Sequence, residues 1–239
     1  MRRSRLAFVV ASAFVVSSAL AACGSQTASA PTSTSVSTAP TTTGGASGPP
    51  TSLTIYRVVK GIVVPRTLQV PHTEAVATAA VNALSPGAGV AIAGGTATVD
   101  LPQASPAVVA EIVYTLTQFP TIDRVDVAGR TGLTRADVSG YAPIILIDAP
   151  AADGHVSQAI RVRGSAVVFE ATLVVELVRD GKVIDTKNVT ASAGAPERGT
   201  FETTLQAPSP GPASIVAFAP SAEDGSPQHE VTVPVTVGH

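Results

Sequence analysis

The chain of 239 residues has 15 basic and 17 acidic side chains, a formal net charge of −2 and only 4% aromatic residues. It contains no basic stripe interleaved with aromatic residues, which excludes a nucleic-acid-binding protein. A single cysteine excludes an internal disulfide.

The first 22 residues have the pattern of a secretion signal. Arg2, Arg3 and Arg5 precede an uncharged run over residues 6–20. As a helix, that run would be about 22 Å long at ~1.5 Å per residue, which is shorter than a bilayer core of about 30 Å. We therefore expect a signal peptide over residues 1–22 and not a membrane span.

The only cysteine directly follows this run and two small residues. Leu20-Ala21-Ala22-Cys23-Gly24 resembles the bacterial lipobox, in which the thiol receives diacylglycerol and the signal is cut just before the cysteine. The resemblance implies lipidation of Cys23, with palmitate among the acyl chains, and anchoring in the lipid bilayer. The expected location is the extracytoplasmic face of the cell membrane. A secreted protein with a chance cysteine is the alternative.

Residues 23–51 form the expected tether. After the cysteine, the sequence to Thr51 consists of Ser, Thr, Ala, Pro and Gly with one Gln, one Val and no charge. Such a sequence buries too little apolar surface to offset the entropy of ordering. We expect a disordered stalk between the lipid anchor and the folded part.

The first folded region is expected over residues 52–132, as a small α+β domain with two helices. Thr73 is the expected cap of the first helix, and Ser105 with Pro106 begins the second. The apolar face expected for the second helix is Val109, Ile112, Val113 and Leu116. The expected strands are 53–59, 62–70, the two strands of a short hairpin that turns at Gly94-Gly95, of which the second is 96–101, and 122–127, so that the element order is ββαββαβ. This order predicts two helices on one face of a small sheet.

Parts of this region resemble the GerMN domain, which is named from sporulation and spore-germination proteins. The matching stretches are Thr96–Leu101, Ile112–Pro120 and Ile122–Val125, while Ser85–Gly94 is shorter than the family usually has. Related folds build rings in envelope complexes. The resemblance therefore implies protein–protein assembly, oligomers included, and not catalysis.

The second folded region is expected over residues 142–238, as an all-β immunoglobulin-like sandwich. Helical periodicity ends here and short strands recur between turns. Asp180-Gly181 predicts a two-residue hairpin turn, and Pro234 predicts that the last strand lies at a sheet edge. The expected strands are 144–147, 159–164, 168–178, 183–190, 200–206, 214–218 and 230–237.

Three spaced segments of this region resemble Gmad2, the immunoglobulin-like domain associated with spore germination. They are Gly164–Ala171, Ser192–Pro196 with Gly199–Phe201, and Pro220–Pro227. Gmad2 often follows GerMN in one chain, and the same tandem order is present here. Both domains also occur in bacteria that make no spores.

No group of residues has the spacing of a catalytic or metal site, and we expect no enzyme, cofactor or metal. Asp123 with Asp126, and Glu223 with Asp224, leave two interpretations open, a calcium or catalytic pair and a solvated surface; we favour the surface. The histidines lack the spacing of metal ligands. They are His72, His155, His229 and His239.

Glu170 is a charged residue inside an apolar pattern. Phe169, Ala171 and the alternate residues after them are expected on one buried face of the strand. A buried Glu170 would need a partner, and Arg161 or Arg163 on the neighbouring strand is expected to supply it. A structural ion pair is favoured over a binding site.

These observations predict a non-catalytic lipoprotein of the cell envelope. Its expected partners are the lipid bilayer through acylated Cys23 and an unidentified envelope protein or peptidoglycan. A role beside a membrane sensor kinase is one form of this hypothesis. The alternatives are a receptor for peptidoglycan or another glycan, and a cell-wall hydrolase that uses a carboxylate.

Overall fold

The computed structural model describes residues 48–238 of the chain. These residues lie within one compact unit, which contains two hydrophobic cores. The predicted signal peptide, Cys23 and most of the predicted tether lie outside the described residues. The first strand begins at Thr51, the last residue assigned to the tether.

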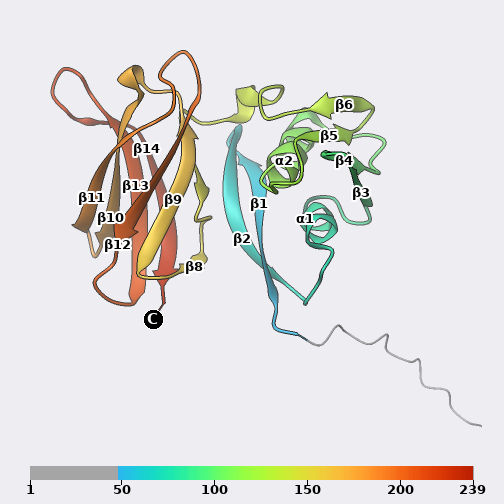
Figure 1. Cartoon of the computed structure of the whole chain (residues 1–239), viewed down its shortest axis with the longest axis horizontal. Helices are drawn as coiled ribbons and strands as arrows, with labels where there is room; N and C mark the ends of the chain where they lie inside the picture. Colours follow the sequence, from blue (N-terminus) through green and yellow to red (C-terminus); the bar gives the residue numbers. More distant parts are fainter. Residues whose placement is uncertain (1–47, 239) are drawn as a thin grey trace, which may run out of the picture. The chain divides into compact units, whose positions relative to one another are not determined.

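The α+β domain has two helices and six strands (Figure 1). They are β1 (Thr51–Val59), β2 (Ile62–Val70), α1 (Val76–Leu84), β3 (Val90–Ala93), β4 (Thr96–Val99), α2 (Pro106–Leu116), β5 (Arg124–Val127) and β6 (Arg130–Leu133). The predicted strands and helices are all present, and β6 is an additional strand after the predicted order.

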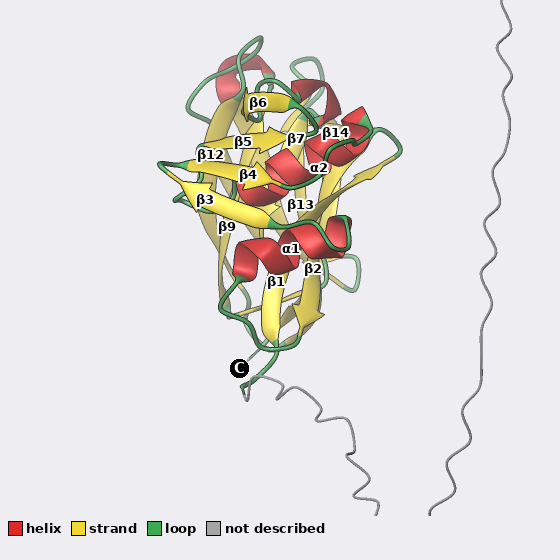
Figure 2. Ribbon diagram, turned by 90° about the vertical axis from the view of Figure 1, so that its right-hand side faces the viewer, coloured by secondary structure: helices red, strands yellow, loops and turns green. Residues whose placement is uncertain are grey.

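The strands of this domain form two sheets, and the prediction of helices on one face of a single sheet is wrong. β1 and β2 pair only with each other, while the second sheet has the order β3-β4-β5-β6, visible as four adjacent strands in Figure 2. α2 contacts β1 on one side and β5 on the other. The reason is that α2 is buried along Val109–Leu116, and a helix buried all round needs cover on both sides.

The two helices begin in different ways. Ser105 is confirmed as the cap of α2, since its hydroxyl accepts from the Val108 amide at 3.4 Å. The prediction that Thr73 caps α1 is wrong, because α1 begins at Val76 after Ala75. The Thr73 hydroxyl accepts from the Ala75 amide at 3.1 Å, so it forms a local turn before the helix.

The sandwich domain consists of two sheets with the orders β11-β10-β13-β14-β8 and β12-β9-β7. Its elements are β7 (Ile145–Ala149), β8 (Gly154–Val156), β9 (Ala159–Ala166), the short helix η2 (Phe169–Ala171), β10 (Thr172–Arg179), β11 (Lys182–Thr190), β12 (Gly199–Gln206), β13 (Gly211–Pro220) and β14 (Pro227–Val237). The seven predicted strands are present. The fold class is confirmed, and β8 is an addition.

The predicted strand 168–178 is interrupted at its start. η2 occupies Phe169–Ala171, and only the residues from Thr172 form β10. Leu173 is buried as predicted, but the Phe169 side chain is 73% exposed. The alternation of apolar residues in β10 continues back to Phe169, so the sequence predicted that Phe169 belongs to the strand. In the structure, positive φ angles at Glu170 and Ala171 (53° and 57°) turn the chain before the strand begins.

The structural ion pair favoured for Glu170, which assumed a buried side chain, is therefore wrong. Glu170 is exposed and has no salt bridge within the described chain. Arg161 binds Glu202 instead, at 2.7 Å. Because Glu170 lies in a turn exposed to solvent, its charge needs no partner.

The prediction that the last strand lies at a sheet edge is wrong only for the end of β14 (Pro227–Val237), where a further strand pairs with it. β14 pairs with β13, and its residues Val235–Val237 pair with β8, which is the edge strand. Pro234 lies just before this pairing, and its carbonyl accepts from the Asp153 amide at 2.9 Å. The proline thus lies in the part of β14 that β8 does not pair with.

Candidate functional site

β7 belongs to the cores of both domains. Ile145 and Ile147 are buried in the sandwich core, while Leu146, on the opposite face of the strand, is buried in the core of the α+β domain. Successive side chains of a strand point to opposite faces. One strand therefore contributes to two cores, and the next residue on the Leu146 face is Asp148.

Asp148 is the centre of a polar cluster between the domains. Its Oδ1 accepts from the Tyr56 hydroxyl at 2.5 Å and from Nη1 of Arg135 at 2.9 Å. The Arg135 guanidinium also lies 5.3 Å from the ring centre of Tyr56 and 4.8 Å from that of Tyr114. We call Tyr56, Tyr114, Arg135 and Asp148 the latch, because they join β1, α2 and the loop after β6 to the sandwich.

Burial determines the ionisation of the latch. It raises the pKa of Tyr56 well above its usual range, and the neighbouring Asp148 charge raises it further. Burial alone would lower the pKa of Arg135, but the Asp148 carboxylate and Tyr56 outweigh this effect and raise it. Tyr56 is therefore neutral and Arg135 is charged at neutral pH.

Three polar side chains of α2 and the turn after it hold Tyr56 in place. Glu111 accepts from the Val58 amide at 2.8 Å, Thr115 accepts from the Tyr56 amide at 2.9 Å, and Gln118 donates to the Thr54 carbonyl at 2.7 Å. Their spacing is that of one helix face, and they meet alternate residues of the β1 edge. These residues were not predicted, although a polar stripe of this spacing in an apolar helix is visible in the sequence.

The outer edge of β2 is bound by the sandwich. The Thr67 amide donates to the Ala152 carbonyl at 3.0 Å, and the Ala152 amide donates to the Pro65 carbonyl at 3.3 Å. Arg66 also pairs with Asp153 at 3.2 Å. The hairpin β1–β2 is therefore fixed on both of its edges.

An open groove of about 760 Å³ lies beside the latch. Thr54, Thr117 and Gln118 line it from the α+β domain, and residues of β7, β9, β11 and β12 and of the loop after β11 line it from the sandwich. The sandwich residues are Asp148, Ala149, Arg163, Gly164, Thr190, Ser192, Thr200, Phe201 and Glu202. Most of these side chains are polar, and we call this the interdomain groove.

The loop between β9 and β10 displays Phe169 at the surface of the sandwich. The two residues that follow it have positive φ angles, a conformation that costs about 1–3 kcal/mol for each non-glycine residue. Such a conformation persists only where its surroundings impose it.

Hydrogen bonds to the loop after β11 impose this conformation. The Val168 carbonyl accepts from the Ala195 amide at 2.9 Å, and the Ala171 carbonyl accepts from the Ala191 amide at 2.8 Å. A Cβ at Gly194 would lie 2.8 Å from the Ala171 nitrogen, so the two loops are in close contact. The exposed Phe169 is thus held on a fixed loop.

The candidate residues named from the sequence do not come together. Within residues 48–238, no group of three or more His, Cys, Asp or Glu side chains is placed to hold a metal ion. Asp126 accepts from the Gly132 amide at 2.7 Å, and Asp224 accepts from the Ser226 amide at 3.0 Å. Both carboxylates thus serve turns. Cys23 and His239 lie outside the described residues.

The histidines that the structure describes lie in separate places. His72 follows β2, His155 is in β8 and His229 is in β14. None of the helices described is long and apolar enough to cross a membrane.

Comparison with solved structures gives weak similarities. An engineered protein is 21% identical with a TM-score of 0.30, and the match covers 50% of this chain and 23% of that one. CopC from Methylosinus trichosporium OB3b is 18% identical (TM-score 0.26; 37% and 85% covered). The tandem GerMN domains of the sporulation protein GerM from Bacillus subtilis are 17% identical (TM-score 0.32; 79% and 61% covered).

Two family models match the sequence, whereas no curated protein matches it. The model described as sporulation and spore germination, Germane, matches residues 46–128. The model described as the immunoglobulin-like domain of bacterial spore germination, Gmad2, matches residues 144–226. Both resemblances predicted from the sequence are confirmed. Residues 46–128 therefore match the Germane (GerMN-like) family, and residues 144–226 match the Gmad2 family, in this order.

Proposed function

We propose that this protein is a non-catalytic interaction module of the cell envelope, tethered to the membrane through Cys23, that binds a partner protein with the loop around Phe169. Both matched families are described by a process, sporulation or germination, and neither description names a reaction. The observation that supports the proposal most directly is the exposure of Phe169.

An exposed aromatic side chain on a fixed loop is well suited to protein binding. Phe169 is the most exposed of the large apolar side chains described, at 73%. Burying a phenylalanine stabilises a complex by about 1.5–3 kcal/mol. Because the loop is already ordered, little conformational entropy is lost on binding. Aromatic anchors of this kind dominate the energy of many interfaces.

The predicted tether determines where in the cell envelope the folded domains are expected to act. The predicted stalk between Cys23 and Thr51 separates the folded domains from the lipid anchor. A stalk of this composition lets the interaction surface search the space near the membrane. The partner is therefore expected among proteins of the same envelope.

The proposal is tested by crosslinking in living cells, with a C-terminal tag on the full chain and mass spectrometry of the captured proteins. One dominant envelope protein is expected, and Phe169→Ala should reduce its recovery about tenfold. Val183→Ala is the matched control, because Val183 is another apolar side chain of the sandwich and is 51% exposed. It should leave the recovery unchanged.

Cys23→Ala tests the anchor separately. The variant should be lost from the membrane fraction and should no longer capture the partner. Equal recovery with Phe169→Ala and the unaltered chain would refute the role of the loop. Retention of Cys23→Ala in the membrane fraction would refute the lipid anchor.

A further inference from the structure

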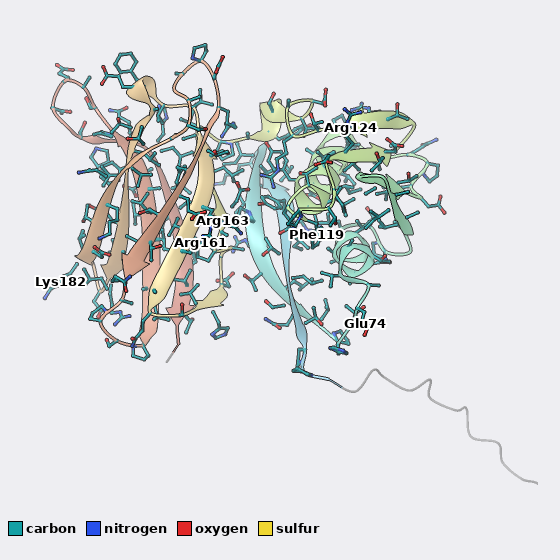
Figure 3. The ribbon with its side chains drawn as sticks, viewed as in Figure 1. Glu74, Phe119, Arg124, Arg161, Arg163 and Lys182 are labelled. Carbon is teal, nitrogen blue, oxygen red and sulfur yellow. The ribbon has the colours of Figure 1, made fainter. Side chains whose placement is uncertain are left out.

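Arg163 is a guanidinium without a partner in a row of charged groups. The register of the sheet places it between Ala149 of β7 and Glu202 of β12. Figure 3 shows Arg161 and Arg163 along the same strand, β9. Within residues 48–238, Arg163 forms no hydrogen bond through its side chain and no salt bridge.

The carboxylates beside Arg163 are already paired with other arginines. Asp148 binds Arg135 at 2.9 Å, and Glu202 binds Arg161 at 2.7 Å. The hydrogen bond from Arg161 also lowers the pKa of Glu202, so this carboxylate is charged at neutral pH. Three guanidinium groups therefore share two carboxylates. Arg161 does not line the interdomain groove, but it binds Glu202, so Arg163 is the lining guanidinium that no carboxylate binds.

This positive charge stands out in an acidic part of the protein. Residues 133–239 have seven basic and twelve acidic side chains. An anion is repelled by most of that surface and attracted to the groove. An arginine binds a carboxylate with two parallel hydrogen bonds, which makes it a selective partner for this group.

The walls of the groove favour a ligand rich in hydroxyl and amide groups. Thr54 and Gln118 line one side, and Thr190, Ser192 and Thr200 line the other. Both amide hydrogens of Gln118 are bound, to the Thr54 carbonyl and to the Thr115 carbonyl, each at 2.7 Å. Its Oε1 is therefore left as an acceptor for a ligand. The volume of about 760 Å³ matches sites for small molecules.

We propose that the interdomain groove binds a small ligand that has a carboxylate among hydroxyl and amide groups, with the carboxylate bound to Arg163. Acidic fragments of peptidoglycan have this chemistry, either in the sugar acid or in the stem peptide. The site is independent of the lipid anchor and of Phe169, so it stands or falls separately from the proposed function.

Isothermal titration calorimetry with the purified full chain in mild detergent tests this proposal. The probes are N-acetylmuramic acid, with a carboxylate on the sugar, and L-alanyl-D-isoglutamine, with a carboxylate on the peptide. N-acetylmuramyl-L-alanyl-D-isoglutamine joins this sugar to this peptide through the sugar carboxyl group, so only the peptide carboxylate remains. N-acetylglucosamine is the neutral control. Saturable binding of at least one acidic probe, and none of the control, is expected, and the strongest probe identifies the source of the carboxylate.

Three single substitutions locate the site. Arg163→Gln should weaken binding about tenfold or more, because it removes the free charge. Lys182→Gln removes one charge from the exposed hairpin between β10 and β11, distant from β9 within the sandwich (Figure 3), and should have no effect. Glu202→Gln should strengthen binding, because it removes a negative charge from the lining of the groove beside Arg163.

The melting temperature of each variant is recorded first, to show whether it is folded. If Arg163→Gln is not folded, the binding of Glu202→Gln tests the proposal in its place. Unchanged binding in a folded Arg163→Gln variant would overturn the proposal. Weaker or unchanged binding in Glu202→Gln, equal binding of the neutral sugar, or no saturable heat with any probe would overturn it as well.

Discussion

Asp148 shows how a charge is kept between two domains. Its side chain is only 24% exposed, and it is bound by one hydroxyl and one guanidinium. The same guanidinium covers two tyrosine rings, and each contact of this kind contributes about 0.5–2 kcal/mol. If a carboxylate loses such partners but remains largely buried, the folded state is strongly destabilised.

The ionisation of Tyr56 predicts a loss of stability in alkali. Its folded pKa is above the usual 10.0, so the unfolded chain releases the proton first. The stabilisation is complete below pH 10 and is lost as the pH rises toward the folded pKa. The free energy of unfolding should fall by up to about 1.4 kcal/mol per pH unit above pH 10 for this group. Urea unfolding at pH 8, 10 and 11 measures it.

Tyr56→Phe is the control for this dependence. At pH 8 the variant should be less stable by about 1.5–3 kcal/mol, because Asp148 loses a hydrogen bond. Between pH 10 and 11 its stability should fall less steeply than that of the unaltered chain. Some fall remains, since burial also raises the pKa of Tyr114. Identical slopes would contradict the assignment.

At the scale of elements, α2 acts as a partner strand for β1. Its polar stripe binds the outward-facing backbone groups of alternate β1 residues. The side chains of the helix can reach alternate strand residues because the two spacings are similar: one helical turn advances about 5.4 Å and two strand residues advance about 6.7 Å. Long side chains absorb the difference.

Thr115→Val tests this arrangement with little change in volume. Thr115 is fully buried, and the substitution leaves the Tyr56 amide without an acceptor. The free energy of unfolding should fall by about 1–3 kcal/mol. Thr98→Val is the matched control, because Thr98 is the exposed residue of β4, and it should change this free energy by less than about 0.5 kcal/mol. Chemical denaturation at pH 7 compares the two, and equal effects would contradict a special role for Thr115.

The elements predicted correctly from the sequence are those with local signals. Ser105 with Pro106 marks the start of α2, and Asp180-Gly181 marks the turn before β11, with φ angles of 49° and 72°. η2 could not be predicted, because Phe169 fits the alternation of β10. The turn there depends on hydrogen bonds to a loop more than 20 residues later in the chain.

The candidate sites show the same limit. The latch combines Tyr56, Tyr114, Arg135 and Asp148, and the free state of Arg163 depends on which arginine reaches which carboxylate. No spacing in the sequence indicates such pairings, because they arise from the register of strands and from contacts between domains. The sequence did identify Arg161 and Arg163 as neighbours on one strand, although it assigned them the wrong partner.

At the scale of the whole molecule, the shared strand β7 joins the folding of the two domains. Unfolding of either domain exposes an apolar side chain of β7 that was buried in it. The latch and the contacts of β2 with Ala152 add to this coupling. Residues 48–238 are therefore expected to unfold together.

Scanning calorimetry tests this coupling. The unaltered chain should show one thermal transition. The double variant Leu146→Ala with Asp148→Asn should show two, because it removes the apolar contact and the ion pair between the domains while the sandwich core retains Ile145 and Ile147. Deleting the buried Leu146 side chain should cost about 2–5 kcal/mol. Two transitions in the unaltered chain, or one in the double variant, would contradict the coupling.

The covering of the β1–β2 hairpin has a consequence for aggregation. A strand with unpaired backbone groups at a sheet edge recruits strands from other molecules. Here α2 side chains occupy one edge and Ala152 with Asp153 occupies the other. A two-stranded sheet, which would otherwise have two free edges, is thus blocked at the middle of each edge against the addition of a foreign strand. This hairpin is therefore protected from extension by strands of neighbouring molecules.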